Sequence, residues 1–87
     1  MAFFTARILS KDGVVIAEDV EVWINFFRVS DEPRWDGSLE VPVTTPLAPL
    51  TYRLQLVDGR EGIIANIAAQ IRGDNIVVYF EGQGPLA

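Results

Sequence analysis

The sequence contains no cysteine and no histidine, and its only lysine is Lys11. Without cysteine the chain forms no disulfides, and without cysteine and histidine it lacks the usual ligands of zinc. Histidine is also the side chain that most often acts as a general acid or base near neutral pH. A disulfide scaffold, a Cys/His metal site and histidine-dependent catalysis are therefore excluded. We expect the protein to need neither a metal nor a cofactor.

Positive charge is scarce and dispersed. Twelve acidic residues face seven basic ones, which gives a formal net charge of -5. The arginines are spread along the chain at positions 7, 28, 34, 53, 60 and 72. Binding to nucleic acid requires clustered cations that displace counterions from phosphates. We therefore do not expect nucleic acid as a partner.

Long apolar runs are also missing. No segment approaches the roughly 18 apolar residues of a membrane-spanning helix. The first eleven residues lack the basic start and the cleavage site of a signal peptide. These features predict a cytoplasmic protein that does not enter a membrane. The 87 residues, 49% of them apolar, are expected to form one small β domain over residues 1–87.

Residues 51–82 give the clearest structural signal. Three runs of alternating apolar residues are joined by the turn dipeptides Asp58-Gly59 and Gly73-Asp74, which predict two hairpins with two-residue turns. The expected cross-strand pairs are Leu54 with Ile63, Tyr52 with Ala65, Ile71 with Ile76, Ala69 with Val78, and Ile67 with Phe80. A helix over Glu61–Arg72 is the competing interpretation, because the isoleucines there also match helical spacing. We favour the strand because isoleucine is β-branched and Gly62 would fall in the first helical turn.

The N-terminal part predicts a further hairpin. Ala2–Leu9 and residues 14–29 are rich in β-formers and are joined by Lys11-Asp12-Gly13, a three-residue turn with glycine in the left-handed position. The polar pair Glu18-Asp19 interrupts the second strand, where we expect a bulge or bend. Beyond it, strand alternation predicts one set facing the core and another facing outward. The first set is Val20, Val22, Ile24 and Phe26, and the second is Glu21, Trp23, Asn25 and Phe27.

The middle of the chain has few features that favour a β-sheet. Residues 30–37 are polar and include a proline and a glycine, which predicts a loop. Residues 39–43 are expected to form a short edge strand, and three prolines make residues 41–50 an extended connector. The prediction is an all-β fold: a small antiparallel meander barrel, SH3-like or similar, or a compact sandwich of five to six strands. The edges at Ala2–Leu9 and residues 39–43 are candidate contacts between copies.

Few residues of the sequence are suited to catalysis. The serines lie in or beside predicted turns and loops with no base nearby. Two acidic groups, one of Glu18, Asp19 and Glu21 and one of Asp31, Glu32 and Asp36, are candidates for paired-carboxylate chemistry. Clusters of this kind are ordinarily solvated surface. We therefore do not expect an enzyme.

The aromatic residues carry the main functional hypothesis. Trp23 and Phe27 are expected to point outward from one strand, and Trp35 lies in the adjoining loop with Arg34 beside it and Arg28 nearby. Tryptophan, phenylalanine and arginine are the types enriched at the energetic centres of protein interfaces. The candidate interaction surface is therefore Trp23, Phe27, Arg28, Arg34 and Trp35. The alternative is that Trp23 belongs to the core.

One resemblance adds to this interpretation. The stretch Tyr-Arg-Leu-Gln-Leu-Val-Asp-Gly-Arg-Glu-Gly at residues 52–62 and the closing Phe-Glu-Gly-Gln-Gly-Pro-Leu at residues 80–86 resemble a group of short, uncharacterised, strand-rich bacterial proteins. The resemblance implies a small β-barrel and assigns no functional residue. The function expected is that of a non-catalytic module for protein interaction, most simply with a second copy of itself as a homo-oligomer. The alternative is a barrel that binds a small molecule or an oligonucleotide.

Overall fold

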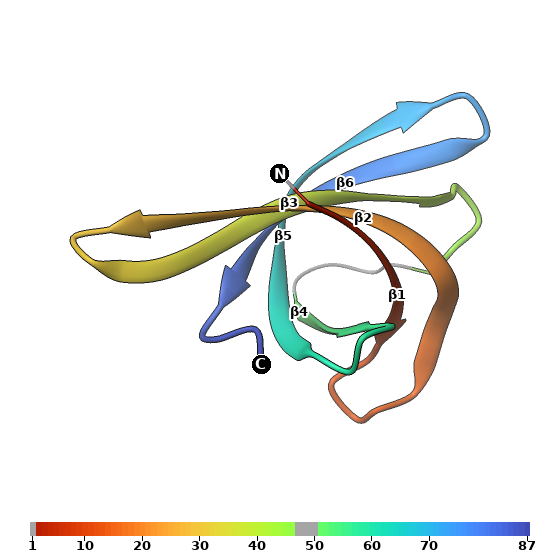
Figure 1. Ribbon diagram of the computed structural model, residues 1–87. Helices are drawn as coiled ribbons and strands as arrows, with labels where there is room; N and C mark the ends of the chain where they lie inside the picture. Colours follow the sequence, from red (N-terminus) through yellow and green to blue (C-terminus); the bar gives the residue numbers. More distant parts are fainter. Residues whose placement is uncertain (1, 47–50) are drawn as a thin grey trace.

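The computed structural model describes residues 2–46 and 51–87, which form six antiparallel strands closed into a barrel (Figure 1). The strands are β1 (Ala2–Leu9), β2 (Val15–Val29), β3 (Glu32–Pro42), β4 (Thr51–Leu56), β5 (Glu61–Arg72) and β6 (Asn75–Gln83). The prediction of a small all-β barrel is confirmed. Glu61–Arg72 is a strand rather than a helix.

The ring is built from two three-stranded meanders. Its order is β1-β2-β3-β6-β5-β4, so the meander β1-β2-β3 joins the meander β4-β5-β6 through the pairs β1–β4 and β3–β6. β3 therefore does not lie beside β4, and the chain does not run around the barrel in simple meander order. Residues 6–9 of β1 and residues 36–42 of β3 pair on both sides. The predicted edges were Ala2–Leu9 and residues 39–43. Barrel formation closes the second half of the first and most of the second, while residues 2–5 pair with β2 alone.

The two Asp-Gly turns have the same geometry. In the first, Gly13 has φ +85° and the Ser10 amide donates to the Val14 carbonyl at 2.8 Å, as predicted. In the second, Gly59 has φ +98° and the Leu56 amide donates to the Arg60 carbonyl at 2.8 Å. This second turn holds three residues, 57–59, because its glycine takes the left-handed position that follows a type I turn.

The extra turn residue moves the β4–β5 register by one position. Tyr52 lies opposite Ile64 and Leu54 lies opposite Gly62, so the predicted pairs with Ala65 and Ile63 are wrong. Side chains alternate with a period of two, and the shift therefore exchanges the faces of β5. Ile64 is fully buried, and Ile63 is only partly buried.

The β5–β6 hairpin follows the prediction near its turn. Ile71 pairs with Ile76 and Ala69 pairs with Val78 across the two-residue turn. The predicted pair of Ile67 with Phe80 is wrong, because a bulge between residues 66 and 68 places Asn66 opposite Phe80. Ile67 is the extra residue of that bulge, and its side chain is 63% exposed.

The bend expected at Glu18-Asp19 is confirmed. Ala6 pairs with Val20 while Ile8 pairs with Ala17, so β2 has one residue more than β1 over this stretch. Asp19 has φ +53°, a left-handed conformation that aspartate tolerates better than most residues.

The predicted loop at residues 30–37 is wrong. Only Ser30 and Asp31 form the turn, both with positive φ (50° and 65°), and pairing with β2 begins at Glu32. Positive φ at both central residues is the two-residue hairpin turn that matches strand twist. Trp35 consequently lies in β3, not in a loop.

The connector predicted over residues 41–50 is seen only in part. β3 ends at Pro42, and the Thr45 amide donates to the Pro42 carbonyl at 2.9 Å in a turn. Residues 47–50 lie outside the described part of the chain.

The core is apolar and includes one tryptophan. Trp35 is 5% exposed, and its ring meets Phe80 edge-on with the centroids 6.1 Å apart. Its Nε1 donates to the Gly84 carbonyl at 2.8 Å. A Cβ on Gly82 would overlap the indole, and one on Gly62 would come within 2.8 Å of Cζ2. The other fully or nearly buried core residues are Ala6, Ile8, Val20, Val22, Ile24, Leu39, Val41, Tyr52, Leu54, Leu56, Ile64 and Val78.

The C-terminal residues close the barrel beside this tryptophan. The amides of Glu61 and Ala87 each donate to the other residue's carbonyl, at 3.0 and 3.2 Å, so the end of the chain pairs with the start of β5. Leu86 packs against the core cluster. The tail thereby covers a core that would otherwise be open at that end.

Two hairpins extend beyond the barrel. Figure 1 shows the β2–β3 tip and the β5–β6 tip projecting in different directions. Phe26 lies on the inward face of β2 but within the projecting part, and it is 51% exposed. The prediction that Phe26 joins the core is therefore wrong, because Phe26 lies in the part of the hairpin that extends beyond the barrel. Ile24, two residues nearer the barrel, is fully buried.

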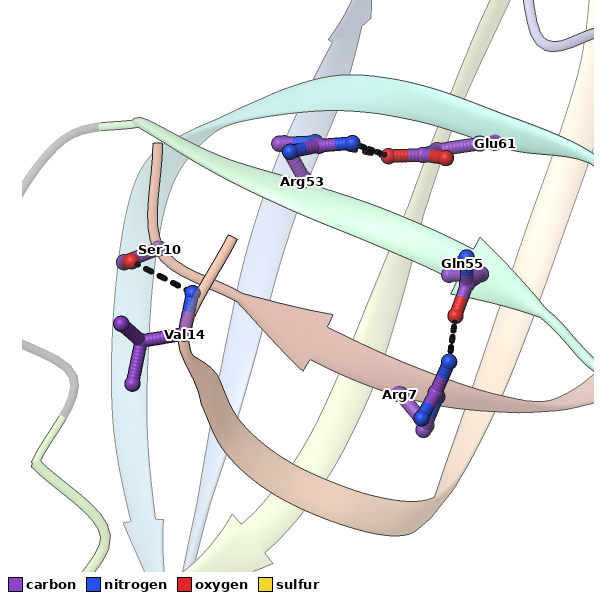
Figure 2. A network of polar contacts seen from close by, with 6 residues as sticks. All are labelled: Arg7, Ser10, Val14, Arg53, Gln55 and Glu61. Carbon is purple, nitrogen blue, oxygen red and sulfur yellow. Dashed lines mark hydrogen bonds and ion pairs between the residues drawn. The ribbon is translucent and has the colours of Figure 1, made fainter. Parts of the chain in front are cut away.

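Polar contacts link the outside of β1, β4 and β5 (Figure 2). Arg53 Nε donates to Glu61 Oε1 at 2.6 Å, and Arg7 donates to the Gln55 side chain. At the nearby turn, the Arg60 side chain bonds to Asp58 and holds the pKa of that carboxyl below its usual value. The polar side chains named here are therefore already engaged with one another on this side of the barrel.

The tight packing around Trp35 leads to a direct prediction about stability. Gly82→Ala is expected to lower the free energy of unfolding by about 1–3 kcal/mol, because the new methyl group overlaps the indole. Gln83→Ala, at the exposed neighbouring position, is the matched control and should change stability by less than about 0.5 kcal/mol. Urea denaturation of both variants measures the difference. Equal stabilities would contradict the packing described.

Candidate interaction surface

Three aromatic side chains lie in one row on the outside of the barrel. Phe3 pairs with Trp23, Trp23 with Ser38, and Ser38 with Tyr79, so the row crosses β1, β2, β3 and β6. The rings of Phe3 and Trp23 are in contact, with centroids 4.8 Å apart. The three aromatic residues are 44–47% exposed. We call Phe3, Trp23, Ser38 and Tyr79 the aromatic row.

Strand alternation accounts for the outward direction of the row. Val22 and Ile24 are fully buried, so Trp23 between them points away from the core. Val78 and Phe80 are buried in the same way and turn Tyr79 outward. The prediction that Trp23 points outward is confirmed, and the alternative that it belongs to the core is wrong.

Acidic residues flank the aromatic row on both sides. Glu21 lies directly opposite Glu40 on one side, and Asp36 lies directly opposite Glu81 on the other. Like charges in directly opposite positions destabilise a sheet. We call these two pairs the acidic pairs.

Neighbouring groups relieve part of this repulsion. Asn25 donates to Asp36 at 3.2 Å, and Asn75 donates to Glu40 at 2.8 Å. Arg72 lies 3.7 Å from Glu40. Among the described residues no ion pair involves Glu21.

A groove crosses the same face. Its volume is about 630 Å³, and its lining includes Glu21, Trp23, Ser38, Glu40, Arg72 and Tyr79. A second hollow of about 310 Å³ shares Trp23, Ser38 and Tyr79 with it. The groove therefore begins at the aromatic row and extends past Glu21 and Glu40 to Arg72 on β5.

The structure brings together some of the predicted surface residues and separates others. Phe27 is 43% exposed and lies opposite Arg34, on the same face as Trp23. Arg28 points to the other face of the β2–β3 hairpin and donates to the Asp31 carbonyl at 3.1 Å. Trp35 is buried and takes no part in an exposed surface. Its inclusion depended on the predicted loop, which is a strand.

Sequence reasoning missed Phe3 and Tyr79. Tyr79 could have been found, since it alternates with Val78 and Phe80 in a strand that was recognised. Phe3 could not, because its position beside Trp23 depends on two successive shifts of the β1–β2 register, of which only one bend was predicted. The row exists only once four strands are placed side by side.

The other candidate residues form no metal-binding cluster in the described part of the chain. No group of three or more potential metal ligands gathers in residues 2–46 and 51–87. Within the same residues, no side chain that is charged at neutral pH is buried. The described part of the chain also has no helix with the length and apolar character needed to cross a membrane.

Comparisons of the chain with protein-family models, with curated proteins and with solved structures found no match.

The two tryptophans should respond in opposite ways to truncation. Trp35→Ala is expected to cost about 3–5 kcal/mol of stability, because a buried ring is lost. Trp23→Ala is expected to cost about 1 kcal/mol, since the side chain is 46% exposed and its ring contact is with the exposed Phe3. Thermal and urea unfolding measure both. Trp35→Phe, which keeps a ring but not the bond to Gly84, keeps the comparison measurable if Trp35→Ala does not fold.

A larger loss for Trp23→Ala than for Trp35→Phe would contradict the placement of the two indoles.

Proposed function

We propose that this chain is a non-catalytic protein-interaction module and that the aromatic row is its contact surface. The observation that supports this most directly is the adjacency of Phe3, Trp23 and Tyr79 on one exposed face. Aromatic side chains of this kind dominate the energetics of protein interfaces. Each lies on a strand of a closed barrel, so the surface is held rigid before a partner arrives, which lowers the entropic cost of binding.

The apolar area bounds how strongly the row can act without other contacts. Each half-exposed ring offers roughly 100 Å², so burial of all three is worth on the order of 7 kcal/mol. Association itself costs about 4–15 kcal/mol. The row alone therefore supports only weak binding, and additional contacts decide which partner is preferred.

A second copy of the chain is the simplest partner. Self-association through the aromatic row brings the acidic pairs of both copies close together, and their repulsion opposes the apolar attraction. Salt screens this repulsion and strengthens apolar burial. Self-association through the row should therefore be weak at low salt and stronger at high salt.

Ligand binding is the second candidate function. The groove of about 630 Å³ between Trp23 and Tyr79 supports it, because the volume lies in the range of small-molecule sites. The acidic pairs argue against an oligonucleotide in the groove, since phosphates would lie near carboxylates.

The test of the proposed function is the solution mass over a hundredfold concentration range at low and at high salt. We expect a concentration-dependent increase in mass that grows with salt and is abolished in Trp23→Ser. Val57→Ser is the matched control, because Val57 is 79% exposed and lies in the β4–β5 turn outside the row. Light scattering after size-exclusion chromatography gives the mass directly. Association that persists in Trp23→Ser would overturn the assignment of the surface.

A further inference from the structure

The groove holds two carboxylates that the fold places side by side at a cost. Glu21 and Glu40 are directly opposite on neighbouring strands, where Cβ atoms are about 4.5–5.5 Å apart and like charges repel. Both residues line the groove. A cation in the groove would remove this repulsion and would gain from both charges.

The fold already places one cation, the Arg72 guanidinium, in the groove. Its guanidinium Nη1 is 3.7 Å from Glu40 Oε1, and Arg72 lines the groove. The Arg72 side chain is 77% exposed, and an exposed ion pair of this length contributes little. A cation from a partner can therefore replace it at low cost.

The aromatic walls suit the same kind of group. Trp23 and Tyr79 line the groove on either side of Ser38. A cation over an aromatic face gains about 0.5–1 kcal/mol at an exposed site, and tryptophan is the best partner. Aromatic faces and carboxylates together recognise an alkylated ammonium or a guanidinium better than a hydrated Ca²⁺ or Mg²⁺ ion, which gains nothing comparable from an aromatic wall because it takes oxygen ligands.

We propose that the groove binds an arginine or lysine side chain carried by a basic peptide segment of a partner protein. This inference rests on the proposed function and names the chemistry of the partner. The second hollow continues from the groove past Asn25 and Asp36, so an extended segment can place a further basic residue near the second acidic pair. The chain's net charge of -5 favours the approach of such a segment.

A second copy of the chain is a poor occupant of the groove by comparison. The face that would meet it carries the same acidic pairs. Its Arg34, which shares the outer face with Phe27, already lies 3.6 Å from Glu32. The observations therefore favour a different, basic chain as the occupant of the groove, and self-association through the aromatic row would compete with it for Trp23, Ser38 and Tyr79.

The experiment uses a blocked peptide of alternating glycine and arginine as the probe, titrated into the isotope-labelled protein. Binding is followed by the two indole N–H resonances. The Trp23 resonance should move and the Trp35 resonance should not, since Trp35 is buried and bonded to Gly84. The control peptide carries citrulline in place of arginine, which keeps the shape and removes the charge. The inference is overturned if the citrulline peptide binds equally well or if neither peptide moves the Trp23 resonance.

Two variants with opposite expected effects sharpen the test. Glu21→Gln removes a charge from the groove and should weaken arginine-peptide binding about two- to fivefold, whereas Arg72→Ala removes the internal competitor and should tighten it by a similar factor. Val57→Ser should leave binding unchanged. Weaker binding by Arg72→Ala would contradict the competition and overturn the inference.

Salt separates this inference from the proposed function. Arginine-peptide binding should weaken with salt, while self-association through the aromatic row should strengthen. If the peptide fails to bind but Trp23-dependent association remains, the cation groove is wrong and the interaction module stands. If the peptide binds as expected while the mass is independent of Trp23, the groove stands and self-association through the row is wrong.

Discussion

The indole of Trp35 packs against the backbones of Gly62 and Gly82, and the outer face of the barrel depends on this contact. With Trp35 inside, alternation along β3 also turns Leu39 and Val41 inward. The same alternation turns Asp36, Ser38 and Glu40 outward, where they contribute to both acidic pairs and to the centre of the aromatic row. Two residues without side chains, in the paired strands β5 and β6, therefore make room for the core and set the direction of the groove.

Closure of the barrel gives this face its second property. Because β3 pairs with β6 and β1 pairs with β4, the wall that carries Phe3, Trp23 and Tyr79 is supported by both meanders. The repulsion between the opposed carboxylates is therefore present in the free protein. A surface that keeps like charges adjacent gives up stability that a partner of opposite charge can restore.

Local turn chemistry and strand alternation predicted much of the fold. The turn at Lys11-Asp12-Gly13, the bend at Asp19 and the outward direction of Trp23 all follow from residues near each other in the sequence. The β4–β5 register was missed because an Asp-Gly dipeptide fits turns of two and of three residues equally well. The loop prediction at residues 30–37 failed because polar composition and a proline outweighed strand pairing that only tertiary structure reveals. The groove could not be predicted, since it needs β2, β3, β5 and β6 placed together.

The measurement that tests the account most directly is hydrogen exchange of the two indole N–H groups in the unmodified protein. The Trp35 N–H, buried and bonded to the Gly84 carbonyl, should exchange only when the barrel opens. The Trp23 N–H, on the exposed row, should exchange at close to the rate of a free peptide. Two indoles protected alike, or a protected Trp23 beside an exposed Trp35, would contradict the arrangement on which the surface, the groove and the proposed partner all depend.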